Sequence, residues 1–145
     1  MARLPDKLKL EIVSPDSLLF SGDVDEVSVP GVRGYLGILP GHAPLLAELK
    51  IGEICYRQGD RRSYLFCSWG FLEVLPDRVS VLAQIAERPE AIDVSRAQVA
   101  RDRAEKRLKS KDPDIDFKRA QVALERALGR LQVAGRAGVS KLGGE

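Results

Sequence analysis

Hydrophobic and polar residues alternate along the first half of the chain. In the segment KLKLEIV (residues 7–13), leucine and isoleucine stand at every second position between charged residues, which is the pattern of a strand with one buried face. Comparable short segments follow up to residue 87, and turn-forming residues such as the pair Gly59-Asp60 separate them. Many short strands with frequent turns predict an antiparallel β-sandwich or barrel of about 85 residues.

The pattern changes to a helical period after Pro89. Residues 94–108 lack proline, are rich in Ala, Arg, Glu and Lys, and carry small and apolar side chains at steps of three and four. Asp93 is the expected N-cap of this helix. After a short polar stretch, Asp116 is the expected N-cap of a second amphipathic helix, which ends near Gly135. Two such helices joined by a short turn predict an antiparallel hairpin.

We therefore predict an α+β fold in which an N-terminal antiparallel β-sandwich is followed by a C-terminal antiparallel two-helix hairpin. The sandwich domain comprises residues 1–90, and the hairpin domain comprises residues 91–145 with a frayed tail. The hairpin is expected to be marginally stable because its seam is mostly alanine, which buries little apolar area at about 25 cal/mol per Å². Gly129 lies inside the second helix and costs about 1 kcal/mol relative to alanine. A helix pair held this weakly can detach and extend.

The composition excludes several classes of protein. Hydrophobic residues make up 44% and charged residues 30% of the 145-residue chain, as in an ordinary globular protein. No apolar run approaches about 18 residues, and the N-terminus lacks the apolar stretch of a secretory signal. We therefore expect a cytosolic chain that does not insert into a membrane and meets one only through partner proteins.

The two cysteines, Cys55 and Cys67, flank the predicted turn at residues 59–60. This turn places Cys55 opposite Tyr64 rather than opposite Cys67, so the register argues against a disulfide. The chain has one histidine and no Cys-x-x-Cys pair, so no metal site is expected. Both cysteines are interpreted as ordinary strand residues.

Charge is divided unevenly between the two domains. Residues 1–92 carry 10 Lys and Arg against 13 Asp and Glu, a net charge of −3, whereas residues 93–145 carry 13 against 8, a net charge of +5. The basic C-terminal part is therefore expected to meet something acidic. Nucleic acid, an anionic lipid surface, a nucleotide and an acidic protein segment are all candidates on charge alone.

Four segments in order resemble the epsilon subunits of F-type ATP synthases. They are VPGVRGYLGILPGHAPLLAELKIGE (29–53), GFLEVLPDRVSVLAQIAE (70–87), IDVSRA (92–97) and DIDFKRAQVALERALGRL (114–131). The resemblance implies a ten-stranded sandwich that docks on the gamma subunit and the ring of membrane c subunits. It also implies a hairpin that folds against the sandwich or extends into the catalytic alpha/beta head. Tyr35 departs from the many relatives that carry an acidic residue there, at the edge expected to meet the ring.

The segment from Ile92 to Ala97 resembles the Ile/Leu-Asp-x-x-Arg-Ala pattern that opens the first helix of ATP-binding bacterial epsilon subunits. This resemblance implies that the adenosine end of ATP is surrounded by Glu87, Ile92, Asp93, Arg96 and Ala97, and that the phosphates face Arg103, Arg126 and Arg130. ATP is then a regulatory ligand that is not hydrolysed.

The spacing of these arginines is compatible with one site. The two arginines of the first helix are seven residues apart and those of the second are four apart, so each pair shares a helix face. In an antiparallel hairpin the two faces can converge. The alternative is an ordinary solvated face, for which Asp102, Glu105 and Glu125 offer local partners.

Three functions compete on this sequence. The first is a non-catalytic rotor subunit that couples rotation to proton flow, inhibits ATP hydrolysis and lies peripherally at the cytoplasmic face of the cell membrane. The second is a freestanding hydrolase, but His42 has no evident nucleophile beside it, and the glycines around Gly34 lack a Gly-Lys-Ser/Thr ending. The third is a nucleic-acid-binding module, but stacking aromatics are absent after Phe117. We expect the first function and no nucleic-acid partner.

Overall fold

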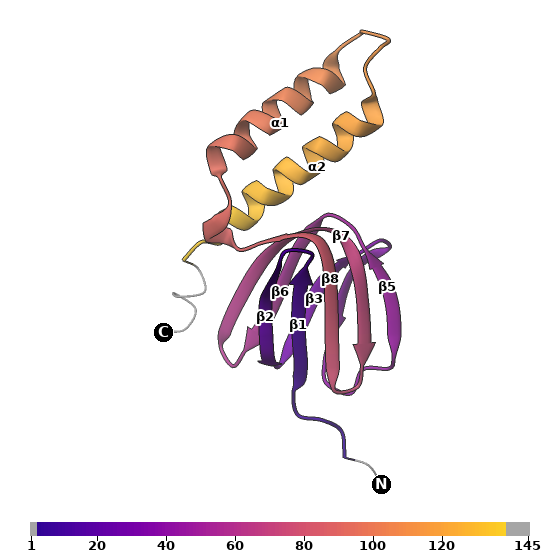
Figure 1. Ribbon diagram of the computed structural model, residues 1–145, viewed down its shortest axis with the longest axis vertical. Helices are drawn as coiled ribbons and strands as arrows, with labels where there is room; N and C mark the ends of the chain where they lie inside the picture. Colours follow the sequence, from indigo (N-terminus) through magenta and orange to yellow (C-terminus); the bar gives the residue numbers. More distant parts are fainter. Residues whose placement is uncertain (1–2, 139–145) are drawn as a thin grey trace.

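The computed structural model describes residues 3–138, in which a β-sandwich carries a helical hairpin at one end (Figure 1). Eight strands form the sandwich within this part of the chain. They are β1 (Leu8–Ser14), β2 (Ser17–Val24), β3 (Glu26–Gly31), β4 (Gly34–Ile38), β5 (Leu45–Leu49), β6 (Gly52–Gln58), β7 (Arg61–Leu75) and β8 (Arg78–Glu87). The predicted α+β fold, with strands first and helices last, is confirmed.

The long strand β7 contributes to both layers of the sandwich. β5 and β6 pair with β7 in one continuous register, in which Leu49 lies opposite Gly70 and Gly52 lies opposite Cys67. Trp69 stands between these two pairings with a positive φ of 56°. A β-carbon at Gly70 would lie 2.2 Å from the backbone oxygen of Leu82, so only glycine allows β7 to approach β8 this closely.

The strand count differs from the ten strands that the resemblance implies. The described residues form eight strands, and the 15 residues of β7 count as one of them although they pair first with β6 and then with β5. The pairings are antiparallel except for one, since β1 and β8 run parallel with Leu10 opposite Val79.

Alternation along the strands fills the sandwich core. In β1, Leu8, Leu10 and Ile12 are fully buried while the lysine and glutamate between them are exposed, as the period of two predicts. The predicted hairpin register is also confirmed, because Cys55 lies opposite Tyr64 and both cysteines are free. Burial raises the pKa of the Cys67 thiol to about 12, so this thiol stays protonated and unreactive.

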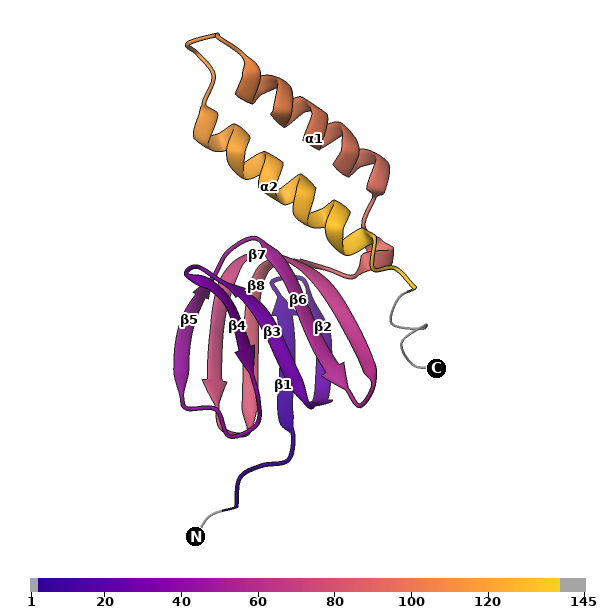
Figure 2. The ribbon, with the colours of Figure 1, turned by 180° about the vertical axis from the view of Figure 1, so that it is seen from behind.

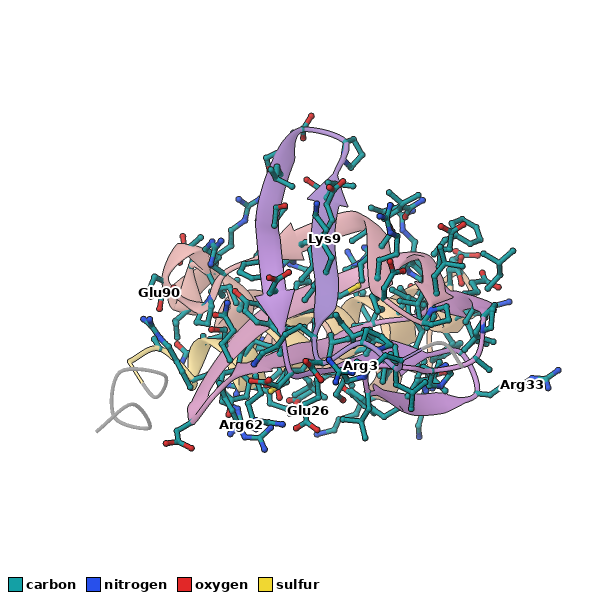
Figure 3. The ribbon with its side chains drawn as sticks, turned by 90° about the horizontal axis from the view of Figure 1, so that it is seen from below. Arg3, Lys9, Glu26, Arg33, Arg62 and Glu90 are labelled. Atoms are coloured by element: carbon teal, nitrogen blue, oxygen red, sulfur yellow. The ribbon has the colours of Figure 1, made fainter. Side chains whose placement is uncertain are left out.

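Ion pairs cover one edge of the sandwich. Figure 3 views it from the end opposite the hairpin, where Glu26 and Arg62 lie together. The carboxylate of Glu26 contacts Arg62 at 3.3 Å and Arg57 at 3.4 Å. These partly exposed pairs contribute about 0–1 kcal/mol each.

The hairpin begins and ends where the sequence predicts. A 3₁₀ turn (Pro89–Ala91) leads to α1 (Val94–Lys109), and α2 (Phe117–Ala134) returns to the sandwich. The Asp93 and Asp116 side chains accept hydrogen bonds from the backbone N–H groups three residues later, each at 3.0 Å. Both N-caps are therefore confirmed, and Gly135 is the C-cap of α2.

The seam between the two helices consists of small residues. Ala97 and Ala104 of α1 and Ala120 and Ala127 of α2 are buried. These methyl groups bring the helices close together but bury little area at each contact, as the sequence predicts. Neither helix in residues 3–138 combines the length and apolar character that crossing a membrane requires.

The helix α2 rests on the end of the sandwich, and α1 lies farther away (Figures 1 and 2). A second apolar cluster joins Phe66 of β7, Ile92 and Val133, with Ile51 packed against it. Gly129 lies above this cluster, and a β-carbon there would be 2.9 Å from the Phe66 ring. Gly129 therefore allows α2 to approach the sandwich, a packing role that its low helix propensity does not reveal.

Candidate functional site

A groove of about 590 Å³ lies between α1, α2 and the adjoining edge of the sandwich. Its walls combine carboxylates, arginines and small apolar side chains. They are formed by Glu87, Ala91, Asp93, Arg96, Ala97, Val99, Ala100, Arg103, Ala123, Arg126, Ala127 and Arg130. Both helices and the end of β8 are needed to form this groove, so it exists only when the hairpin is folded against the sandwich.

Seven of the eight residues proposed from the sequence line this groove, namely Glu87, Asp93, Arg96, Ala97, Arg103, Arg126 and Arg130. The eighth, Ile92, is buried with an exposed fraction of 8% and packs against Phe66 and Val133. Ile92 therefore anchors the start of the hairpin, while its neighbour Asp93 faces the groove and caps α1. The predicted convergence of the two arginine faces is present in the structure.

Arg130 is held by a carboxylate and an aromatic ring. Its Nε donates to Glu87 Oε1 at 2.8 Å and its Nη2 donates to Oε2 at 3.3 Å. The guanidinium carbon also lies 5.0 Å from the centroid of the Phe66 ring. This two-pronged contact fixes the orientation of the guanidinium and offsets part of its charge.

Arg126 is oriented by Ser68, a residue that the sequence did not indicate. The Arg126 Nε donates to Ser68 Oγ at 3.2 Å, and Ser68 is fully buried. A buried hydroxyl needs a partner, and the guanidinium supplies it. The sequence could have indicated this role, because Ser68 is a polar residue within the apolar run LFCSWGFL. A buried hydroxyl in such a run needs a hydrogen-bond partner from another element.

Arg96 and Arg103 keep their charges available to the groove. Neither forms an ion pair within residues 3–138. Asp102, one of the partners considered for an ordinary solvated face, contacts Arg101 at 3.3 Å instead. Four arginines against Glu87 and Asp93 leave the groove with a net charge of +2, which suits an anion.

A second contact, which we call the clasp, fixes the end of α2 and consists of Arg136, Glu53 and Tyr64. Nε and Nη2 of Arg136 donate to the two Glu53 oxygens at 3.2 and 3.4 Å. The Arg136 guanidinium carbon lies 4.7 Å from the centroid of the Tyr64 ring. The Glu53 side chain is only 12% exposed, and its carboxylate raises the pKa of Arg136. The Glu87 contact and the clasp therefore hold the chain at two points, Arg130 and Arg136, which are six residues apart.

The chemistry of the groove favours phosphate over metal. Within residues 3–138, no group of three His, Cys, Asp or Glu side chains is placed to hold a metal ion. Guanidinium groups match the planar geometry of phosphate oxygens. The arrangement can therefore bind an anionic ligand and, because it spans both helices, hold them together.

Family models cover the chain in two parts. Residues 7–89 match the β-sandwich domain of the ATP synthase delta/epsilon chain, and residues 90–135 match its long α-helix domain. The chain belongs to the ATP synthase delta/epsilon chain family. The resemblance to epsilon subunits that the sequence motifs carry is confirmed.

Relatives within the delta/epsilon chain family match over most of their length. The chain is 53% identical over 111 residues to the ATP synthase epsilon chain of Koribacter versatilis, covering 77% of this chain and 78% of the relative. It is 48% identical over 136 residues to ATP synthase epsilon chain 2 of Syntrophotalea carbinolica, covering 93% and 99%.

Solved structures share the fold at low sequence identity. A chain of the Euglena gracilis mitochondrial ATP synthase structure, which contains OSCP, F1 and the c-ring, aligns with a TM-score of 0.79 at 20% identity. That alignment covers 95% of this chain and 84% of the other. A chain of the Tetrahymena thermophila central stalk and c-ring aligns with a TM-score of 0.54 at 13% identity, covering 93% and 98%. These two likenesses concern the fold alone.

Proposed function

We propose that this chain is a non-catalytic rotor subunit in the central stalk of an F-type ATP synthase. It couples rotation to proton flow and inhibits ATP hydrolysis through its hairpin, which senses ATP. The groove supports the proposal that the hairpin senses ATP, because arginines from both helices converge there only while the hairpin is folded. Membership of the delta/epsilon chain family supports the rotor part.

ATP is the proposed regulatory ligand of the groove, and it is bound without being hydrolysed. The adenosine end lies near Glu87, Asp93 and Ala97, where the groove meets the sandwich. The phosphates extend toward Arg103 of α1 and Arg126 of α2, whose guanidinium groups form charge-assisted hydrogen bonds with phosphate oxygens. One ligand then connects both helices to the sandwich.

Binding shifts the hairpin toward the folded form because only that form contains the groove. At about a hundred times its dissociation constant, ATP adds about 2.7 kcal/mol to the folded form. The alanine seam alone is weak. Pairing of Arg130 with the Glu87 carboxylate reduces the repulsion among the arginines, so the empty hairpin is more stable than four unpaired guanidinium groups would allow. Ser68 orients Arg126 but does not offset its charge.

The sandwich provides the proposed docking surfaces for the rotor. Leu46, Phe71 and Leu82 are exposed by 77%, 64% and 55% on adjacent strands, and Phe71 is paired with Leu82. Exposed apolar residues clustered in this way suit a protein partner, and we assign this face to the gamma subunit. The β3–β4 turn around Tyr35 is assigned to the c-ring, and the extended hairpin to the alpha/beta head. The complex places the chain peripherally at the cytoplasmic face of the membrane.

We expect Arg103→Ala and Arg126→Ala each to weaken ATP binding by about tenfold or more, because each removes a charge-assisted contact. Calorimetric titration of the isolated protein with ATP measures this. Arg101→Ala is the matched control, since Arg101 pairs with Asp102 outside the groove. No binding by the parent at millimolar ATP would refute the sensor function and leave the rotor function standing.

A chain that ends at Ala91 is expected to assemble and to couple proton flow to synthesis, while ATP hydrolysis by the complex rises. The physical reason is that the main core cluster is formed by residues 8–86, so the sandwich closes without the hairpin. The measurement compares hydrolysis by complexes with the full and shortened subunit, and proton pumping by vesicles that contain them. Equal hydrolysis in both complexes would show that the hairpin does not inhibit.

A further inference from the structure

The groove of the proposed ATP site does not end at Arg103 and Arg126. A second hollow of about 660 Å³ adjoins it along the hairpin, and these two arginines line both. The residues that line the second hollow belong to the later turns of α1 and the first turns of α2. These turns lie toward the tip of the hairpin (Figure 1). The two hollows therefore form one channel that runs from the sandwich toward the tip.

The outer part of this channel is more basic than the inner part. Arg107, Lys118 and Arg119 line it in addition to the two shared arginines, and Asp116 is its one carboxylate. Five cations against one acid give a net charge of +4, compared with +2 for the inner part. The Asp116 carboxylate already accepts the backbone N–H of Arg119 as the helix cap.

These outer cations are not neutralised by the rest of the described chain. Arg107, Lys118 and Arg119 form no ion pair in residues 3–138. Arg107 lies one helical turn beyond Arg103 on the same face, which is a rise of about 6 Å along α1. A phosphate chain that leaves Arg103 in the direction of the tip meets these groups next.

We infer that the channel binds adenine nucleotides whose linear phosphate chain is longer than three, and binds them more tightly than ATP. This inference rests on the proposed function, which places the adenosine at the sandwich end and the phosphates at Arg103 and Arg126. Arg107 and Arg119 then contact the fourth phosphate. Such a ligand connects the tip of the hairpin to its base and holds it folded more firmly than ATP does.

Calorimetric competition between ATP and adenosine 5′-tetraphosphate tests the inference on the full chain. We expect the tetraphosphate to bind about tenfold more tightly, which corresponds to about 1.4 kcal/mol. Arg107→Ala/Arg119→Ala is expected to remove this advantage while ATP affinity changes less than about threefold, since these two side chains contact the fourth phosphate, which ATP lacks. Lys109→Ala/Lys111→Ala removes the same charge outside the channel and is expected to keep the advantage.

The remaining outcomes separate this inference from the proposed function. Equal affinity for ATP and the tetraphosphate overturns the inference and leaves the ATP site standing. Loss of the advantage in the lysine control also overturns it, because general charge is then responsible. Inorganic tetraphosphate that binds as tightly as the nucleotide overturns the adenosine assignment. Failure of both nucleotides to bind refutes the proposed function and the inference together.

Discussion

Gly129→Ala is expected to move the hairpin off the sandwich. The new β-carbon would lie 2.9 Å from the Phe66 ring and 3.5 Å from a methyl group of Ile51. Phe66 is fully buried, so its ring has little room to yield, and overpacking of this kind costs about 1–3 kcal/mol. Alanine also favours the helical state by about 1 kcal/mol relative to glycine, but α2 is helical in the docked form as well, so this term does not shift the docking equilibrium.

Overpacking therefore disfavours the docked form by about 1–3 kcal/mol, a factor of about five or more in the equilibrium. Small-angle scattering of the isolated protein reports the larger radius of the open hairpin. In the assembled complex, the same variant is expected to inhibit ATP hydrolysis more strongly at a given ATP concentration, because the extended form is the inhibitory one under the proposed function.

The control for this prediction is a double-mutant cycle with Phe66→Leu. The smaller side chain makes room for a β-carbon at position 129, so Gly129→Ala is expected to perturb docking less in the Phe66→Leu background than in the parent. An equal perturbation in both backgrounds would show that a contact other than the one with Phe66 governs the effect. A parent-like radius in Gly129→Ala would contradict the prediction altogether.

The second large effect is expected from a substitution in the clasp. Arg136→Gln is expected to release the end of α2, because it removes both hydrogen bonds to Glu53 and the contact with the Tyr64 ring. The carboxylate of Glu53 is then left largely buried without its cation. Charge-assisted hydrogen bonds contribute about 1.5–3 kcal/mol. Because the Arg136 side chain is 39% exposed, solvent screens the pair, and we expect a loss of about 1–2 kcal/mol.

Amide hydrogen exchange is the measurement that localises this effect. The last turn of α2 is expected to exchange about five- to thirtyfold faster in Arg136→Gln, while the core of the sandwich keeps its protection. Arg61→Gln, on the exposed end of the β6–β7 hairpin, removes the same charge and is expected to leave exchange unchanged. Arg136→Lys keeps the charge but not the planar guanidinium, so its exchange rate in the last turn of α2 is expected to lie between those of Arg136→Gln and Arg61→Gln. Parent-like exchange in Arg136→Gln would mean that the apolar cluster around Phe66 holds α2 without the clasp.

The clasp and the proposed ATP site hold the C-terminal part of the chain at different residues. The ATP site involves Arg126 and Arg130, whereas the clasp involves Arg136, one residue beyond the segment that matches the long α-helix domain. The backbone N–H of Glu53 also donates to the hydroxyl of Tyr35 at 3.0 Å. Tyr35, near the start of β4, is therefore tied to the same residue that holds the hairpin.

Local patterns in the sequence determined the elements and much of the site. The alternation of residues 7–13 fixed a half-buried strand because side chains alternate across a strand. Asp93 and Asp116 fixed two helix starts because a side-chain carboxylate satisfies free backbone N–H groups. Helical spacing placed Arg96 and Arg103 on one face, because this spacing depends only on nearby residues. The resemblance to epsilon subunits indicated Glu87 as a residue of the groove.

The tertiary structure alone decided how these elements meet. Ser68, Glu53 and Tyr64 contact arginines at least 58 residues away in the chain, since Ser68 is 58 residues from Arg126 and Glu53 is 83 residues from Arg136. No local periodicity encodes such pairings. Gly129 reads in the sequence as a helix-weakening residue, and only the approach of Phe66 shows that it is required for docking. The physical reason is that propensity and periodicity are properties of one segment, whereas close packing and charge pairing depend on two segments brought together by the fold.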